Sequence, residues 1–461
     1  MTRRKTKKES AELLARLAKE GMDATSPMTS WERDFEEKAR KQGQAEMDQR
    51  LAELPAETGK PKACPRCGKR ARVRARGVAR TFQSLWGTHT IVRDYHYCEV
   101  CKEGFYPRDE FLGLPKEGNL TEEVESRIAD FAVNDAYAEA EGRWRFHYRL
   151  LPVSENQFRQ VARRLGTQLE EANLIVAETA LRPPPLEASK RLYVLADGGM
   201  VPMRQGWRET KVGVLFREEN HLSGREAPRG SVSEARYTAT LASQEEFKKH
   251  MEAALNVENA VKAEQVVWLA DGAPANWLLA RALCPQATQI LDWYHAVEHA
   301  MDCGKALLGE GYPGLAEWQQ RAESLLMAGD FDALLAEFDA CRPEAIASGA
   351  EGALDELLNY YRTNRERMAY AGFRAQGLLI GSGIVESAHR HVIQTRMKKA
   401  GQHWSERGGR QMARLRAAYR TTGADRFYKA IRWAHRASLR ISANLPKPHK
   451  VDLRRKGMAN R

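Results

Sequence analysis

Residues 192–199 read LYVLADGG, an apolar run that ends in Asp-Gly. Such a run predicts a buried β-strand whose last residue, Asp197, projects a carboxylate from the end of the strand. Residues 266–272 read VVWLADG and repeat the same form, so they predict a second strand that ends at Asp271. The two segments therefore predict a sheet that carries one aspartate at the end of each of two strands.

Further elements are predicted around these two strands. They are strands at 211–216, 236–241 and 290–292, and helices at 243–255, 275–283 and 294–307. The resulting order is three strands, helix, strand, helix, strand, helix, which is typical of a ribonuclease-H-like fold. The first and fourth strands are neighbours in that fold, so we expect Asp197 and Asp271 to come together.

A third carboxylate is expected on a helix. Residues 380–388 read IGSGIVESA, in which Ser382 would cap a helix and Glu386 would lie in its first turns. The stretch at 309–379 is rich in Ala, Leu and Glu and predicts an all-α insertion before this helix. Phosphodiester cleavage needs an activated nucleophile and a stabilised leaving oxygen, and two Mg²⁺ or Mn²⁺ ions held by carboxylates provide both. Each acid alone would be better explained as a cap or a solvated loop residue, but the joint pattern favours a metal site.

Four of the seven cysteines form two Cys-x-x-Cys pairs, and they are Cys64, Cys67, Cys98 and Cys101. The residues between the pairs are rich in Thr, Val, Ile and Tyr around a Gly-containing turn, which predicts a β-hairpin. Two such pairs predict a zinc ribbon, and the zinc is structural because four thiolates leave no open position on the metal. The scattered Cys284, Cys303 and Cys341 are interpreted as core thiols.

Charge is unevenly distributed along the 461 residues, whose formal net charge is +12. Residues 60–115 hold 12 basic and 5 acidic groups, residues 390–461 hold 20 and 3, and residues 116–389 hold 29 and 41. Basic segments neutralise phosphates, so nucleic acid is the expected partner, with a solvated tail or an anionic membrane as the alternative. No apolar run of about 18 residues and no signal peptide is present, so neither a membrane span nor secretion is expected.

Two groups of side chains are expected to contact DNA. In the ribbon they are Arg72, Arg74 and Arg76, and after Glu386 they are Arg390, Arg396, Lys398, Lys399, His403 and Trp404. Residues 116–180 predict a helix, a turn and a basic helix capped by Ser154. This order is similar to a helix-turn-helix, although any helical bundle gives the same pattern.

The segments around Asp197 and Asp271, together with residues 380–388, resemble the DDE transposases of bacterial insertion sequences, in particular the Kra-type group. The cysteine ribbon and residues 360–361, 364–368 and 396–399 are also similar to that group. The resemblance covers about residues 60–420. It implies that Asp197, Asp271 and Glu386 form a catalytic triad that binds two divalent metal ions.

Mutator and hAT transposases carry an Asp or Cys, two further residues and a His after the second catalytic Asp, and residues 292–295, DWYH, resemble this signature. The resemblance implies that His295 lies near the scissile phosphate. The alternative is a strand-end Asp292 and a helix His that are satisfied internally.

In some of these relatives a Trp of the all-α insertion stacks on a flipped base. Trp318 is the only Trp of the insertion here, and a place in the helix core is the preferred explanation for it.

The sequence therefore predicts an α/β multidomain protein. Its expected parts are a charged N-terminal arm (1–59), a zinc ribbon (60–115), a helix-turn-helix-like DNA-binding domain (116–180), a ribonuclease-H-like core (190–308 and 380–420), an all-α insertion (309–379) and a basic C-terminal tail (421–461). The resemblance implies a transposase of the bacterial cytoplasm and nucleoid, at least dimeric, that cleaves transposon ends at terminal inverted repeats. It would then join the 3′ hydroxyl to target DNA. The alternatives are a zinc-ribbon DNA-binding regulator without catalysis and a housekeeping nuclease.

Overall fold

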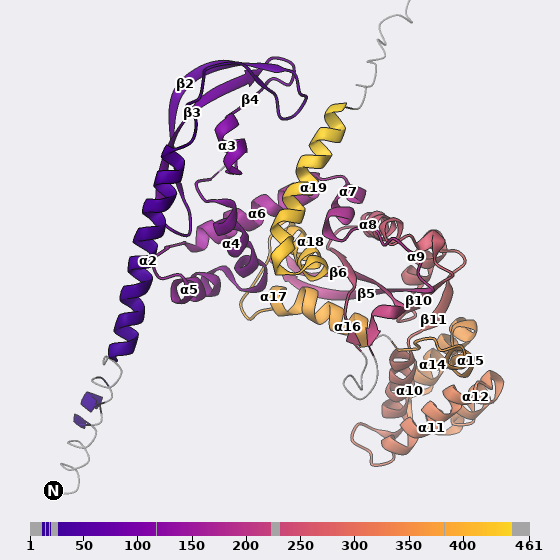
Figure 1. The fold of residues 1–461 in the computed structure, drawn as a ribbon. Coiled ribbons are helices and arrows are strands. Elements are labelled where there is room, and N and C mark those ends of the chain that lie inside the picture. Colours follow the sequence, from indigo (N-terminus) through magenta and orange to yellow (C-terminus); the bar gives the residue numbers. More distant parts are fainter. Residues whose placement is uncertain are drawn as a thin grey trace, which may run out of the picture. The chain divides into compact units, whose positions relative to one another are not determined.

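The structure is a computed structural model of the 461-residue chain. It describes residues 12–13, 15–17, 19, 26–116, 118–222, 231–381 and 383–444. The chain is a mixed α/β protein with two larger sheets (Figure 1). It divides into two compact units, the first made of residues 1–125 and 144–153 and the second of residues 126–143 and 154–461. Across the described residues, every helix is too short or too polar to cross a membrane.

The first unit contains a four-stranded antiparallel sheet in sequence order. Its strands are β1 (Lys62–Ala63), β2 (Arg70–Gln83), β3 (Thr88–Cys98) and β4 (Glu103–Phe105), and α3 (Pro107–Leu112) follows. β2 and β3 form the hairpin expected between the cysteine pairs. The charged residues before it form a helix, α2 (Pro27–Ala52), where the sequence predicted only an arm. Asp48 of α2 accepts a hydrogen bond from the buried His89 ring of β3 at 2.6 Å, which ties the helix to the hairpin.

The second unit is built on a five-stranded sheet with the order β11-β10-β5-β6-β9. The strands are β5 (Arg191–Met203), β6 (Gly206–Arg217), β9 (Arg236–Thr240), β10 (Gln265–Ala270) and β11 (Thr288–Leu291). β5, β6 and β9 form an antiparallel meander, and β10 and β11 continue the sheet in parallel to β5. The five strands lie where the sequence predicted them, and β5 and β10 are neighbours as expected. The short strands β7 (His221–Leu222) and β8 (Ser231–Val232) pair separately.

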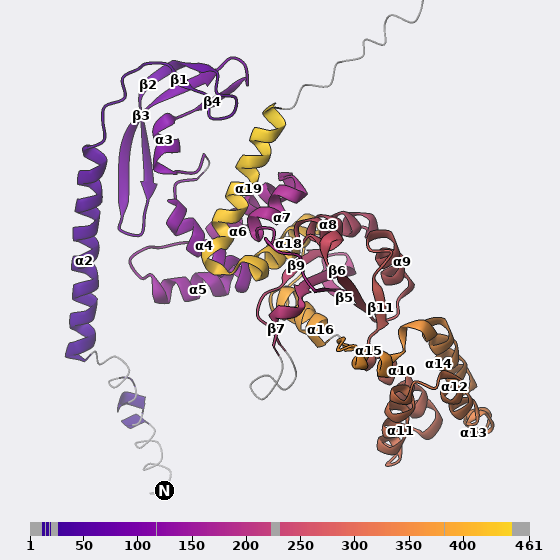
Figure 2. The same cartoon turned by 45° about the vertical axis from the view of Figure 1, so that its right-hand side comes forward.

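The remaining helices precede this sheet in the chain, connect its strands or follow it. They are α4 (Glu122–Asn134), α5 (Tyr137–His147), α6 (Glu155–Glu171), α7 (Leu174–Leu181), α8 (Gln244–Val257), α9 (Pro274–Leu283), α10 (Trp293–Leu308), α11 (Leu315–Ala328), α12 (Phe331–Asp339), α13 (Arg342–Ser348), α14 (Glu351–Asn364), α15 (Tyr370–Ala375), α16 (Gly383–His389), α17 (Thr395–Met397), α18 (Glu406–Thr422) and α19 (Ala424–Asn444). α10 to α15 gather beyond β11 in both views (Figures 1 and 2), and α11 to α15 form an all-α insertion before α16. Trp318 of α11 packs on Gly304 and donates to the carbonyl of Ala300 at 2.7 Å, which fits the preferred core role.

The C-terminal helix corrects the expected boundary at residue 420. α19 packs against α6, α7 and α18, and its Phe427, Tyr428 and Ile431 are buried. Apolar residues at positions i, i+1 and i+4 form one helix face, and the high net charge of this segment concealed that pattern. Residues 424–444 therefore belong to the core of the second unit, whereas residues 445–461 lie outside the described part of the chain.

α6 and α7 were predicted as part of a separate helical domain. Both belong to the second unit, where α7 also lies against α8 and α6 packs against α18. Gly166 of α6 shows how close this packing is, because a Cβ on it would come within 2.8 Å of the Gln411 side chain of α18. The basic helix of the predicted helix-turn-helix is thus fixed to the sheet-bearing unit, with only its outer face exposed.

Candidate functional site

Three aspartates lie in one row at the ends of neighbouring parallel strands. β5 and β10 pair with Leu195 opposite Leu269, and β10 and β11 pair with Ala270 opposite Leu291. Continuing both registers places Asp271 between Asp197 and Asp292. The backbone N–H of Asp292 donates to the carbonyl of Ala270 at 2.9 Å, so the ladder between β10 and β11 extends to this row. Neighbouring residues in one row project to the same face of a sheet, which makes this edge acidic.

Asp271 is held by groups that fix one of its two carboxylate oxygens. Its Oδ1 accepts hydrogen bonds from the backbone N–H of Ala273 at 3.0 Å and from Nδ2 of Asn276 at 2.9 Å. The same Nδ2 lies 3.4 Å from the carbonyl oxygen of Ala196, so one amide bridges the ends of β10 and β5. Among the described residues, Oδ2 of Asp271 accepts no hydrogen bond, and an oxygen of this kind suits a hard cation.

Tyr360 of α14 closes the other side of Asp271. Its hydroxyl donates to the backbone carbonyl of Asp271 at 2.8 Å, and its ring stacks on His299 with centroids 3.8 Å apart. Burial, followed by the charges of nearby carboxylates, raises the pKa of Tyr360, so the hydroxyl stays protonated. Gly272 permits this approach because its φ is +93° and a Cβ would lie 2.6 Å from the Tyr360 hydroxyl. The insertion therefore contributes directly to the shape of this edge.

The Asp-x-x-His segment lies at the start of α10. Asp292 is fully buried, caps the helix and accepts a hydrogen bond from the backbone N–H of His295 at 2.9 Å. The His295 ring is partly exposed, and its Nδ1 lies 3.2 Å from a carboxylate oxygen of Glu298. The structure thus shows the capping role for Asp292 and places His295 one helical turn from the acidic row. His299, one turn further, has a lowered pKa because of burial and then of His295.

The loop that leads into α16 lies against the start of α10. The backbone N–H of Trp293 donates to the carbonyl of Ile380 at 2.9 Å. Gly381 packs so closely on Tyr294 that a Cβ would lie 2.7 Å from the ring. These two contacts with the first residues of α10 therefore fix where α16 begins. Ser382, the predicted cap of this helix, lies outside the described residues.

α16 covers the face of the sheet to which Asp197 projects. Gly213, which pairs with Ala196, meets Met251 of α8, so α8 covers one face of β5 and β6. Gly199 lies on the opposite face and contacts the His389 ring of α16. Residues i and i+2 of a strand share a face, so Asp197 projects toward α16 with Gly199. Its carboxylate Oδ1 accepts a hydrogen bond from the Gly198 N–H at 2.7 Å.

His389 is a buried residue that sequence reasoning missed. Only 4% of it is exposed, its Nδ1 lies 3.2 Å from Nε2 of Gln394, and its Nε2 has no hydrogen-bond partner among the described residues. Burial, and then the charge of Lys398, lowers the pKa of His389 to about 4, so the ring is neutral. Glu386 precedes it by three residues in α16, and such positions share a helix face. The Glu386 side chain itself lies outside the described part of the chain.

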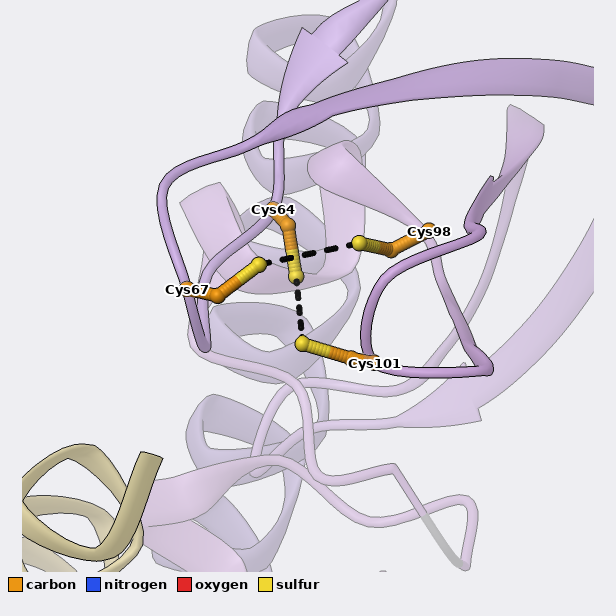
Figure 3. A group of neighbouring side chains, drawn as sticks. All are labelled: Cys64, Cys67, Cys98 and Cys101. Carbon is orange, nitrogen blue, oxygen red and sulfur yellow. Dashed lines mark hydrogen bonds between the residues drawn. The ribbon is translucent and has the colours of Figure 1, made fainter. Parts of the chain in front are cut away.

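The four cysteines of the ribbon point toward one another from two turns (Figure 3). Their sulfur atoms all lie within 4.8 Å, with 3.9 Å between Cys64 and Cys101 and 3.7 Å between Cys67 and Cys98. Four thiolates at about 2.3 Å from a tetrahedral zinc are about 3.8 Å apart, so the geometry fits a structural zinc site. Hydrogen bonds from the backbone at Cys101 and Val100 lower the pKa of the Cys98 thiol to about 7, which favours the thiolate that zinc requires.

Among the described side chains, these cysteines form the only set of three or more His, Cys, Asp or Glu residues whose ligand atoms lie this close together. Asp197 and Asp271 belong to no such set of described side chains, and the Glu386 side chain lies outside the described part of the chain. Among the described side chains, this edge of the sheet is therefore an acidic row that faces α16.

A family model, described as uncharacterised protein family UPF0236, matches residues 63–437. The chain belongs to this family. No curated protein matches the chain. The UPF0236 region includes the cysteine ribbon, the three acids and the buried half of α19, which agrees with the place of α19 in the core of the second unit.

The expected DNA contacts differ in their surroundings. Arg72, Arg76, Arg390, Lys398 and His403 are exposed, while Arg74 pairs with Glu99 and Lys399 with Glu139. Arg396 corrects the prediction, because it is 1% exposed and its guanidinium lies between the rings of Tyr137 and Trp404 at 5.1 and 5.0 Å. Trp404 is half-buried, and its N–H donates to the carbonyl of Met397 at 3.1 Å. Both residues hold α17 and the following loop in place.

Four residues of the site were missed, namely Asn276, Tyr360, His299 and His389. Asn276 follows Asp271 by five residues and lies in the first turn of the predicted helix. That position could have suggested that its side chain reaches back to Asp271 at the end of β10. Tyr360 and His299 meet through the tertiary packing of α14 on α10, which no local pattern shows. His389 could have been found from its spacing, three residues after Glu386 on a predicted helix.

Proposed function

We propose that this chain is a DDE-type DNA transposase that cleaves the ends of a DNA element and joins the freed 3′ hydroxyl to target DNA. The observation that carries the proposal is the row of Asp197 and Asp271 at adjacent strand ends, on a sheet face covered by the helix that contains Glu386. The sheet order β11-β10-β5-β6-β9, with three antiparallel and two parallel strands, is the order expected of a ribonuclease-H-like core. The all-α insertion between α10 and α16 stands where the resemblance places it.

Asp197, Asp271 and Glu386 would hold the catalytic Mg²⁺ or Mn²⁺ ions. Hard cations of this kind prefer oxygen ligands, and Oδ2 of Asp271 is suitably placed while Oδ1 is fixed by its hydrogen bonds. When bound, the metal ions supply activation of the attacking oxygen and stabilisation of the leaving oxygen. The three acids suit divalent metal ions because their side chains are carboxylates and because their backbone positions lie at one edge of the sheet and on the helix that covers it.

Other residues of the chain position these acids. Asn276 orients the Asp271 carboxylate against β5, and Tyr360 holds the Asp271 backbone through its carbonyl. Asp292 anchors the start of α10, from which His295 would approach the scissile phosphate. The contact between Trp293 and Ile380 sets the position at which the helix of Glu386 begins. α10, α14 and the start of α16, which are distant in sequence, are thereby held around one edge of the sheet.

The ribbon would serve DNA binding and would hold zinc structurally. Four cysteine ligands leave no position for a substrate on the metal. Arg72, Arg74 and Arg76 lie on β2, with exposed side chains that suit phosphate contacts. Holding two element ends together requires two copies of the catalytic site, so we expect at least a dimer on DNA. Such an enzyme would act on DNA at the bacterial nucleoid.

The experiment is a cleavage and strand-transfer assay with labelled DNA from the flanks of the reading frame, in Mg²⁺ and in EDTA. We expect wild type to nick at the element ends only with metal, and Asp271→Asn to show no cleavage. Asp302→Asn serves as the control, because Asp302 is an exposed acid on α10 that pairs with Lys305. Specific binding without cleavage by the wild type would instead support the non-catalytic regulator. Cleavage without preference for the ends would support the housekeeping nuclease.

A further inference from the structure

α19 carries a stripe of positive charge on its exposed side. Arg426, Lys429, Arg436 and Arg440 are all exposed, and Trp433 lies in the middle of them with 55% of its surface exposed. Successive members are separated by three, four, three and four residues. At 3.6 residues per turn, the five positions fall within about 80° around the helix axis. They therefore form one face, which we call the α19 stripe.

The opposite side of α19 is fixed to the protein core. Phe427, Tyr428 and Ile431 are buried, and the Ser438 hydroxyl accepts a hydrogen bond from the backbone N–H of Asn173 at 2.9 Å. The helix therefore cannot roll to exchange its faces. The stripe is held outward as a preformed surface, which lowers the conformational entropy lost when a partner binds.

The charges of the stripe are not neutralised by the protein. Among the described residues, its four cations form no ion pair, whereas Arg159, Arg410 and Lys399 of the same unit each pair with a Glu. The fifth basic residue of the helix, Arg432, is buried and donates to the Tyr428 hydroxyl at 3.0 Å, so it plays a structural part. Unpaired cations on one face produce a positive potential that attracts a polyanion.

The dimensions of the stripe suit a nucleic-acid backbone. From Arg426 to Arg440 the helix rises about 21 Å, at about 1.5 Å per residue. Duplex DNA carries one phosphate per about 3.4 Å along each strand, so a stripe of this length passes about six phosphates. An α-helix fits the major groove, which is about 12 Å wide, and cations along one face reach the phosphates that border it.

We propose that the α19 stripe is a docking surface for duplex DNA. The four cations contact phosphates, and Trp433 packs its exposed indole on the sugar and base edges between them. An anionic membrane is the less suitable partner, because an interfacial helix inserts its apolar face and the apolar face of α19 is already buried in the core. The inference rests on the proposed function for the choice of DNA as the polyanion.

The test measures binding of the full-length protein to a 30-base-pair duplex in EDTA across a range of salt concentrations. The variant replaces Arg426, Lys429, Arg436 and Arg440 by Gln. The control replaces four exposed cations elsewhere on the same unit by Gln, namely Lys190, Lys249, Lys262 and Arg281. Each phosphate contact adds about 0.9 to the slope of log affinity against log salt. We expect the stripe variant to flatten the slope by about 3 to 4 and the control to change it little.

A second variant tests the aromatic contact separately. Trp433→Ala should weaken binding about tenfold, because it removes the apolar contact of the exposed indole with the DNA, and it should leave the salt slope unchanged, because it removes no charge. Equal slopes for the stripe variant and the control would overturn the proposal. Binding of wild type to phosphatidylserine vesicles with loss in the stripe variant, and no change on DNA, would overturn it in favour of a membrane. Because EDTA prevents cleavage, a failure of the catalytic proposal leaves this result unaffected.

Discussion

The contact between Gly199 and His389 gives a direct test of how α16 is placed on the sheet. A Cβ added at Gly199 would lie 3.1 Å from Cδ2 of His389 and still closer to Nε2 and Cε1, well under the ~3.5–4.0 Å of ordinary contact. The neighbouring atoms belong to a buried ring with little room to move. The φ of Gly199 is outside the left-handed region, so Gly199→Ala tests packing and not backbone strain.

Overpacking of this kind costs about 1–3 kcal/mol. If α16 lifts from β5 to relieve the overlap, the amides of β5 and α16 should exchange about 5- to 150-fold faster in hydrogen-exchange mass spectrometry. Cleavage should fall with it, because the helix of Glu386 moves away from Asp197. The control is Gly352→Ala on α14, where an added Cβ meets nothing within 4 Å and should stabilise the helix slightly.

The double variant Gly199→Ala/His389→Ala provides the refutation. Removing the ring makes room for the new methyl group, so the double variant should be no less stable than His389→Ala alone, and the two changes should be strongly non-additive. Additive effects, or unchanged exchange in Gly199→Ala, would mean that α16 does not rest on β5 at this point. In that case α16 would not hold Glu386 beside Asp197.

Three other changes are expected to have separable effects. Cys67→Ser should lower the zinc content of the purified protein from one per chain to none. The amides of the β2–β3 hairpin should then lose their protection from hydrogen exchange, while those of β5 and β6 keep it. Zinc retained at one per chain would contradict the zinc ribbon. Truncation after Arg420 should leave the protein insoluble on expression, because it removes the buried Phe427, Tyr428 and Ile431 at about 1.5–3 kcal/mol each; a soluble truncated protein with unchanged thermal unfolding would show that α19 does not belong to the core. Arg236→Met should destabilise the second unit by about 3–5 kcal/mol in denaturant titration, because Glu178 and Glu258 each accept a 2.9 Å bond from the fully buried guanidinium; a neutral effect would show that the two carboxylates are not buried as pairs.

The strands of the core, and the positions of Asp197 and Asp271 at their ends, could be predicted because their signals are local. An apolar run before Asp-Gly marks both β5 and β10, and the capping residue Ser243 starts α8 as expected, accepting from the Glu246 N–H at 3.3 Å. The spacing of the two Cys-x-x-Cys pairs likewise predicted that the four cysteine side chains come together. Short patterns of this kind carry the period of the secondary structure and the chemistry of the ligands together.

Burial of charged residues could not be predicted in the same way. Arg396 stands in a basic run that suggests phosphate contacts, yet Tyr137, from a helix more than 250 residues earlier, covers it. α19 shows the converse case, since its net charge suggested a tail while an apolar face at Phe427 and Ile431 anchors it. In both places tertiary contacts between distant segments determine which side chains are buried, and these contacts cannot be predicted from local composition.

The most direct test of the central claim is anomalous diffraction from crystals of the protein bound to DNA and Mn²⁺. The account predicts two manganese peaks about 4 Å apart, with carboxylate oxygens of Asp197, Asp271 and Glu386 at about 2.1 Å from one or both ions. Peaks at this edge of the sheet without Glu386 among the ligands, or no manganese between Asp197 and Asp271, would contradict the proposal that these three acids form the catalytic site.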